Sequence, residues 1–202
     1  MTEQSVKPSA KNGEGNSPPI KPPRGLYGTA ALMGFSNSTI QSFLRPFAVL
    51  IGLSFGEVGF MTAANNFSST TLQIGWGRLS DKYGRRLFIL AGNLVCGILM
   101  ASFLLPHNPQ SFIMVSALWA VFWSMVQPSW NALLGDYTEL KTRGSVLGLV
   151  GSISQSFSLV AMASAALINL TMAVGSGAAS FVLPFLIAAI AGVAAGLLAL
   201  FV

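Results

Sequence analysis

Residues 77–89 read G-R-L-S-D-K-Y-G-R-R-L-F-I and carry five formal charges within nine positions, between two apolar runs each long enough to cross a bilayer. At roughly 2.5–3.5 kcal/mol for each charged residue at the bilayer centre, burying this segment in lipid would cost more than about 10 kcal/mol. We therefore expect a tight loop at a membrane surface. Its excess of Arg and Lys places that surface on the cytoplasmic side.

The composition of the chain also indicates an integral membrane protein. Apolar residues make up 52% of the 202 positions and charged residues only 8%, whereas a soluble domain carries about 25% charged residues. The net charge of +5 does not indicate nucleic-acid binding, because ten of the eleven Lys and Arg residues lie in residues 1–24, 77–89 and 141–143. The expected spans place these three segments on one side of the membrane, as the positive-inside rule requires. Only Arg45 lies elsewhere. We thus expect membrane lipid, and no nucleic acid, around the protein.

The order of polar and apolar segments predicts an all-α, polytopic membrane protein with six transmembrane helices. Residues 1–24 are rich in Ser, Pro, Gly, Asn and Lys, which predicts a disordered cytoplasmic tail. Residues 25–202 are predicted to form a six-helix transmembrane bundle with both ends inside. The expected spans are residues 26–44, 57–75, 87–105, 111–134, 145–170 and 181–202. Small residues at four-residue spacing in the last two spans are interpreted as helix-packing positions: Gly148, Ser152, Ser156, Ala188, Gly192 and Gly196.

Polar side chains recur at helical spacing inside three spans, where unpartnered polar groups are costly. The three faces consist of Asn37, Gln41 and Arg45, of Thr62, Asn66, Ser69 and Gln73, and of Trp119, Trp123, Gln127 and Asn131. At 1.5 Å per residue, Asn37 and Trp123 lie roughly 17 Å from an end of their spans, close to the bilayer midplane. We therefore predict a substrate cavity lined by Asn37, Gln41, Asn66, Trp123, Gln127 and Asn131.

A second interpretation of these faces stays open. Amide side chains also join transmembrane helices to one another, and tryptophans pack in cores or anchor helices at the membrane interface. Arg45 has two interpretations as well. It either attracts an anionic solute or extends its charged end to water at the outer surface.

The charged segment also resembles a known motif. G-x-L-x-D-x-x-G-R-[KR] between a second and a third span is similar to the loop signature of the major facilitator superfamily of secondary transporters, and Gly77, Leu79, Asp81, Gly84, Arg85 and Arg86 match it. The resemblance covers about residues 25–202. It implies one N-terminal half of the transporter fold, and transport of a small solute by alternating access.

The resemblance further implies a gate at the cytoplasmic surface. In the family, an acid at the position of Asp136 pairs with an arginine of the first loop, so Asp81, Arg85 and Asp136 would form a latch that stabilises the outward-open state. Arg143 closes the second charged loop, residues 135–144. The gating residues are thus predicted to be Gly77, Asp81, Gly84, Arg85, Arg86, Asp136 and Arg143. The alternative is a set of solvated surface charges, each contributing less than about 1 kcal/mol.

Family members usually have twelve spans in two six-helix halves, so the cavity is expected to need a second half. A homodimer, a separately encoded second half, and a truncated, non-transporting fragment or scaffold are all compatible with the sequence. The fifth expected span lacks the glycine-proline signature of drug/proton antiporters in the family, and no Asp or Glu lies deep within a span.

An enzyme is not expected, because no paired acids, metal-ligand cluster or Ser/His arrangement lies at membrane depth. Cys96 and His107 are each the single residue of their type, and they are interpreted as a packing residue and a loop residue. The expected location is a prokaryotic cell membrane with the N-terminus in the cytoplasm. We predict a small-molecule substrate and no cofactor or metal.

Overall fold

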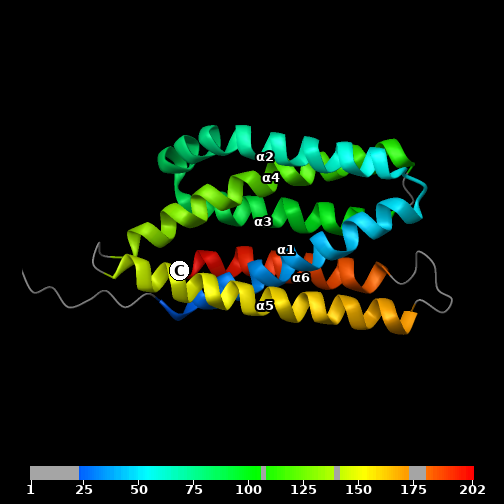
Figure 1. Cartoon of the computed structure of the whole chain (residues 1–202). Helices are drawn as coiled ribbons and strands as arrows, with labels where there is room; N and C mark the ends of the chain where they lie inside the picture. The colour runs from blue at the N-terminus through cyan, green and yellow to red at the C-terminus, as the bar shows by residue number, and fades with distance from the viewer. Residues whose placement is uncertain (1–22, 106–107, 139–141, 173–180) are drawn as a thin grey trace, which may run out of the picture.

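The computed structural model describes residues 23–105, 108–138, 142–172 and 181–202. Most of the expected tail, and His107, lie outside this part of the chain. The described residues form helices α1 (Arg24–Leu50), α2 (Phe55–Tyr83), α3 (Arg85–Ser102), α4 (Pro109–Asp136), α5 (Arg143–Met172) and α6 (Val182–Leu200). Figure 1 shows them running side by side as one elongated bundle.

The helices pack in the order α2, α4, α3, α6, α1 and α5. In Figure 1 the first three form the upper group and the last three the lower group. If α1 is exchanged with α4, α2 with α5 and α3 with α6, the same packing order is obtained in reverse. Every pair of neighbouring helices then corresponds to another pair of neighbours. The bundle is therefore a three-plus-three repeat, as transporter halves are.

Both charged segments lie at the same end of the bundle. Figure 1 places the start of α1, the α2–α3 junction, the end of α4, the start of α5 and the end of α6 at this end. We call it the charged end, because Asp81, Arg85, Arg86, Asp136 and Arg143 lie there. The turn between α1 and α2, residues 51–54, lies at the other end.

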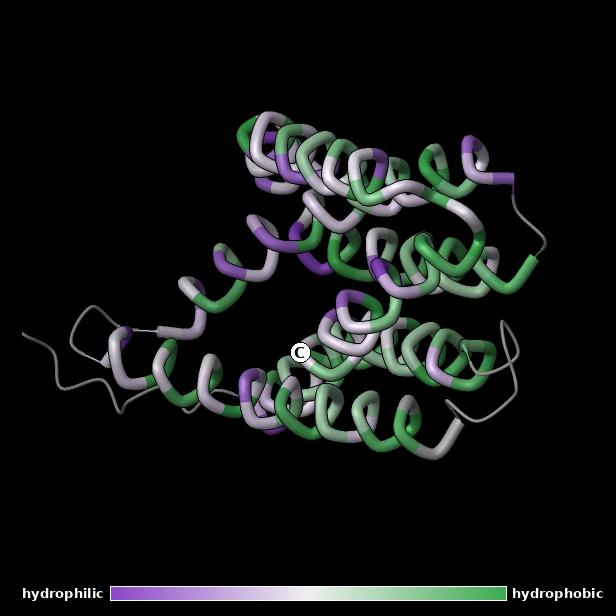
Figure 2. Tube along the Cα trace, turned by 45° about the vertical axis from the view of Figure 1, so that its right-hand side comes forward, coloured by the Kyte–Doolittle hydropathy of each residue, from purple (hydrophilic) through white to green (hydrophobic). Residues whose placement is uncertain are grey.

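Four of the six helices, α3 to α6, are long and apolar enough to cross a membrane on their own. Helices α1 and α2 have 27 and 29 residues, so each is about 40 Å long and exceeds the bilayer core. Their amide and hydroxyl residues lower their hydropathy. Figure 2 shows the resulting mixture of apolar (green) and polar (purple) positions along the bundle.

The prediction of a loop over the charged segment is wrong for most of its length. Helix α2 continues through Gly77 and Asp81 to Tyr83, and α3 begins at Arg85. Only Gly84 lies between them, with a φ of 104° that L-residues with a side chain rarely adopt. Charged residues can remain helical where a helix projects beyond the bilayer. A single glycine between α2 and α3 is then enough to reverse the direction of the chain.

Small residues allow the closest helix contacts. A Cβ on Gly34 of α1 would lie 2.3 Å from the Ser154 carbonyl oxygen of α5, and a Cβ on Gly196 of α6 would lie 2.9 Å from Asn93 Cβ of α3. Ser158 Oγ also donates to the Gly34 carbonyl oxygen at 3.1 Å. Gly148 of α5 differs, because it is exposed and a Cβ there would meet nothing within 4 Å. Its predicted packing role therefore has no partner in the described residues.

An aromatic cluster holds the bundle together at the end opposite the charged end. Phe47 of α1 lies 5.6 Å from Phe112 of α4 and 5.4 Å from Phe185 of α6, between ring centroids. Phe103, directly after α3, lies 5.1 Å from Phe112. All four rings are buried, so four helices are fixed to one another beyond the polar region.

Candidate functional site: a divided cavity and a charged latch

Two adjoining cavities lie along α1 and α4. The larger, about 490 Å³, is lined by α1, α4 and α5. The smaller, about 210 Å³, is lined by α1, α2 and α4. Trp123 and Gln127 of α4 line both. Four-residue spacing places these two side chains on one helix face, and the two cavities meet along that face.

All six residues of the predicted cavity lie in these two linings. Asn37 and Asn131 line the larger cavity, and Gln41 and Asn66 line the smaller one. The faces predicted from helical spacing on α1, α2 and α4 therefore converge on one region. The smaller cavity also includes Arg45.

Helix α5 contributes lining residues that the sequence did not indicate. Ser154, Gln155 and Ser158 line the larger cavity from this helix. They reach it because Gly34 lets α1 and α5 approach closely. Serines in an apolar span are common packing residues, so no local pattern separates these from the others.

Three buried polar atoms around the cavities make no hydrogen bond to any described residue: Asn37 Oδ1, Asn65 Oδ1 and Trp119 Nε1. Trp119 is only 3% exposed, and its ring lies parallel to that of Trp123, with 6.0 Å between centroids and 8° between planes. A buried polar group left unpaired costs about 1–3 kcal/mol. Such atoms are available to a bound molecule.

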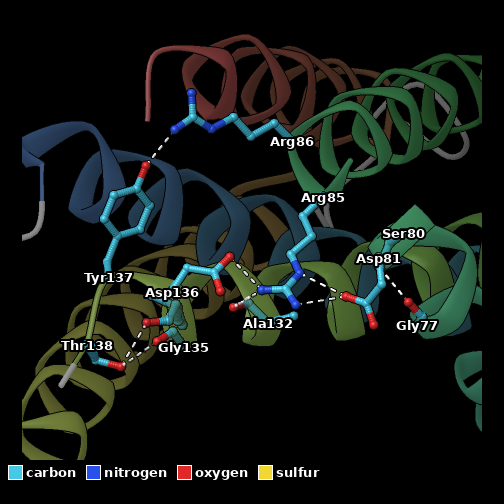
Figure 3. Close-up of polar contacts among 11 residues, drawn as sticks. Gly77, Ser80, Asp81, Arg85, Arg86, Ala132, Gly135, Asp136, Tyr137 and Thr138 are labelled. Carbon is cyan, nitrogen blue, oxygen red and sulfur yellow. Dashed lines mark hydrogen bonds and ion pairs between the residues drawn. The ribbon is translucent and has the colours of Figure 1, made fainter. Parts of the chain in front are cut away.

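Arg85 joins three helices at the charged end, as Figure 3 shows. Its Nη2 donates to Asp81 Oδ1 at 2.8 Å, and its Nε donates to the same oxygen at 3.0 Å. Its Nη1 donates to Asp136 Oδ2 at 2.5 Å and to the Ala132 carbonyl oxygen at 2.9 Å. The ends of α2, α3 and α4 are therefore held by one guanidinium.

Arg86 points away from Arg85 in Figure 3 and makes a second set of contacts. Its Nη2 donates to the Tyr137 hydroxyl oxygen at 2.6 Å and to the Val202 carbonyl oxygen at 2.9 Å. The Tyr137 hydroxyl donates in turn to that same carbonyl oxygen. This cluster links α3 and α4 to the end of α6. The sequence predicts a gating role for Arg86 but does not indicate Tyr137, because the partners of Tyr137 are far away along the chain.

The other predicted gating residues have different surroundings. Gly77 lies inside α2, where a Cβ would be 3.9 Å from Pro128 Cβ of α4. Arg143 makes no ion pair with an acid of the described residues. Its guanidinium lies close to Gly135, where an added Cβ would be 3.1 Å from Arg143 Nη2. Within the described residues, no three His, Cys, Asp or Glu side chains lie close enough together to hold a metal ion.

Comparison with known proteins agrees with this architecture. The family model of the Major Facilitator Superfamily matches residues 26–202. The chain is 30% identical over 147 residues to multidrug resistance protein MdtG of Escherichia coli O81, covering 68% of this chain and 35% of that relative. It is 33% identical over 98 residues to the MFS-type transporter YqjV of Bacillus subtilis, covering 48% and 24%. For the MFS-type transporter MJ1317 of Methanocaldococcus jannaschii, the identity is 31% over 100 residues, covering 48% and 25%. The matched regions thus span about a third or less of each relative.

Proposed function

This chain belongs to the Major Facilitator Superfamily of membrane transporters, and we propose that it is a secondary active transporter that moves a small organic solute by alternating access. The divided cavity carries this proposal. It opens along α1 and α4 about halfway along the bundle, and its lining includes the amides of Asn37, Gln41, Asn66, Gln127 and Asn131. Concave sites with a few converging polar groups are typical of small-molecule binding.

The transport unit is proposed to contain a second six-helix bundle. The chain matches about a third of the length of the relative MdtG. All lining residues of the two cavities come from four helices of this bundle, α1, α2, α4 and α5. A second six-helix bundle would supply the opposite wall, and a separately encoded half or a second copy of this chain would each fit that role. Because halves of this family are related by an axis along the membrane normal, two identical copies have compatible orientations.

The Arg85 contacts are proposed to act as the gate. Closing the charged end would keep solute and water out on that side while the cavity is open on the other. Arg85 is suited to this role because it holds Asp81 of α2 and Asp136 of α4 together. These contacts lie within one bundle, so opening of the charged end would require the ends of α2, α3 and α4 to shift relative to one another as the bundle rocks against its partner.

The protein is a multi-pass membrane protein. We propose that its charged end and N-terminus face the cytoplasm, because Arg78, Lys82, Arg85 and Arg86 lie at the α2–α3 junction. Relatives in bacteria and an archaeon suggest a prokaryotic cell membrane. The relatives named multidrug resistance proteins suggest organic compounds as the substrate class.

Transport by purified protein in proteoliposomes tests the proposal. A panel of radiolabelled organic acids, amides and amines would be offered to vesicles with and without an imposed solute gradient. We expect counterflow of at least one class, with slower exchange in Asp81→Asn and Arg85→Ala variants and normal exchange in Arg78→Ala. Transport that is unaffected by the first two changes would contradict the gate. No counterflow of any class would favour a non-transporting scaffold.

A further inference from the structure

We infer that the smaller cavity is an anion site, which binds the carboxylate of a small organic acid whose apolar body extends into the larger cavity. This inference rests on the proposed function, because it names the chemical class of the transported solute. It starts from the unequal distribution of charge and of unpaired polar atoms between the two cavities.

Charge is the first argument. Arg45 is the one charged residue in the lining of either cavity, as far as the described residues show. It makes no ion pair or hydrogen bond to any of those residues, since both ion pairs of the described chain belong to Arg85. Glu57, on the first turn of α2, is engaged elsewhere, because its Oε2 accepts hydrogen bonds from Ser54 N and Oγ. A guanidinium without an acidic partner favours an anion, and its planar fork matches a carboxylate.

Unpaired donors are the second argument. Trp119 lines the smaller cavity, is almost completely buried, and has no acceptor for its indole N–H among the described residues. An indole N–H can only donate, so it is satisfied by an oxygen acceptor and not by an ammonium group. The amide groups of Gln41 and Gln73 in the same lining can also donate. The unpaired Asn65 Oδ1 would accept a hydrogen bond from a further hydroxyl on the solute.

The volumes of the two cavities indicate where the rest of the solute would lie. About 210 Å³ is small for a whole organic molecule, since ligand sites commonly measure about 300–1,000 Å³. The larger cavity adjoins it at Trp123 and brings Met33, Trp130 and Leu134 as apolar walls. A carboxylate beside Arg45 and an apolar or aromatic body against Trp123 would therefore fill both parts.

Binding of three matched compounds tests this inference. 4-Phenylbutyrate, 4-phenylbutyramide and 4-phenylbutylamine share one body and differ in charge. Their affinities for the purified chain in lipid nanodiscs would be measured by quenching of tryptophan fluorescence excited at wavelengths where the phenyl group does not absorb. We expect the acid to bind about 10-fold more tightly than the amide, because a hydrogen bond to a charged group contributes more than a neutral one. The amine should bind weakest, and added salt should weaken binding of the acid.

Substitutions test whether Arg45 and Trp119 cause the preference for the acid. Arg45→Gln should remove the preference for the acid over the amide, whereas Arg45→Lys should keep part of it and Arg78→Gln, at the charged end, should leave it intact. Trp119→Phe keeps an aromatic ring and removes the indole N–H donor, so it should weaken binding of the acid about 5-fold. Thermal unfolding of each variant checks that it is folded.

Equal affinities for acid and amine in the unmodified chain would overturn the inference, as would an acid preference that survives Arg45→Gln. Failure of all three compounds to bind would also overturn it. The proposed function is tested separately, because these measurements need no transport. Acid-selective binding without counterflow would contradict only the transporter, and counterflow of amines without acid-selective binding would contradict only the anion site.

Discussion

Arg85, the first residue of α3, donates a hydrogen bond of 2.5 Å from Nη1 to the carboxylate of Asp136, the last residue of α4 and 51 positions away. The same guanidinium binds Asp81, one helical turn before it, across the single-residue turn at Gly84. Helices α2 and α3 are joined covalently at this point, whereas the end of α4 is held here by the Arg85 side chain, which binds Asp136 and the Ala132 carbonyl oxygen. Separation of α4 from the α2–α3 pair must therefore break the Asp136 contact.

Removing the charge of Asp136 is expected to open the charged end without unfolding the protein. The Asp81 and Asp136 side chains are 58% and 57% exposed, so each ion pair contributes about 1 kcal/mol or less. That is enough to shift two conformations of similar free energy several-fold. In Asp136→Asn, a cysteine placed at Asn131 should react faster with an impermeant maleimide added at the charged end.

The matched control for this prediction is Glu57→Gln, which removes a carboxylate at the opposite end of the bundle. The native Cys96 is buried, so it should contribute little background labelling. Equal labelling of Asp136→Asn and Glu57→Gln would show that the Arg85 contact does not hold the closed arrangement.

The Tyr137 hydroxyl is expected to fix the end of α6. It accepts from Arg86 and donates to the Val202 carbonyl oxygen, so Tyr137→Phe removes two hydrogen bonds and keeps the ring. We expect a loss of about 1 kcal/mol in stability and faster amide hydrogen exchange over the last turn of α6. Tyr83→Phe is the control, because Tyr83 is exposed and its ring contact with Lys82 needs no hydroxyl. Similar exchange in both variants would contradict a specific role for Tyr137.

Gly34→Ala is expected to disturb the contact between α1 and α5. The new methyl group would lie 2.3 Å from the Ser154 carbonyl oxygen, and neither backbone can move without repacking. Overpacking of this kind costs about 1–3 kcal/mol, which should appear as a lower apparent melting temperature in detergent. Gly28→Ala, on the same helix, would place its methyl 3.7 Å from the flexible Leu198 side chain and should be neutral. A lower melting temperature in Gly28→Ala alone would contradict the packing account.

Helical periodicity explains which parts of the site could be predicted from sequence. Residues four apart share a helix face whatever the tertiary structure, so spacing alone places Asn37 beside Gln41 and Trp123 beside Gln127. The family resemblance and the six-helix fold were confirmed by the family match over residues 26–202. The roles assigned to the cavity and gating residues stay predictions.

Features that depend on which helix covers a face could not be predicted in the same way. Gly148 and Gly196 both sit in small-residue patterns, but only Gly196 is packed against a neighbouring helix. The Arg86–Tyr137 contact joins residues 51 positions apart, and neither residue carries a local sign of the other. The charge of residues 77–89 predicts that they lie outside the lipid, but it does not predict their backbone conformation, so the helical structure of this segment could not be inferred. Gly84 alone marks the reversal.

Gln127 is expected to contact the solute directly, because it lines both cavities. Gln127→Leu keeps a similar side-chain volume and removes the amide, so a solute that hydrogen-bonds there should bind with about 1 kcal/mol less free energy. This predicts a KM for counterflow raised about 5-fold. Gln110→Leu is the matched control, since Gln110 is exposed on the first turn of α4 and lines neither cavity. If the two variants have the same KM, the amide face of α4 serves to join helices, and the cavity assignment for Gln127 fails.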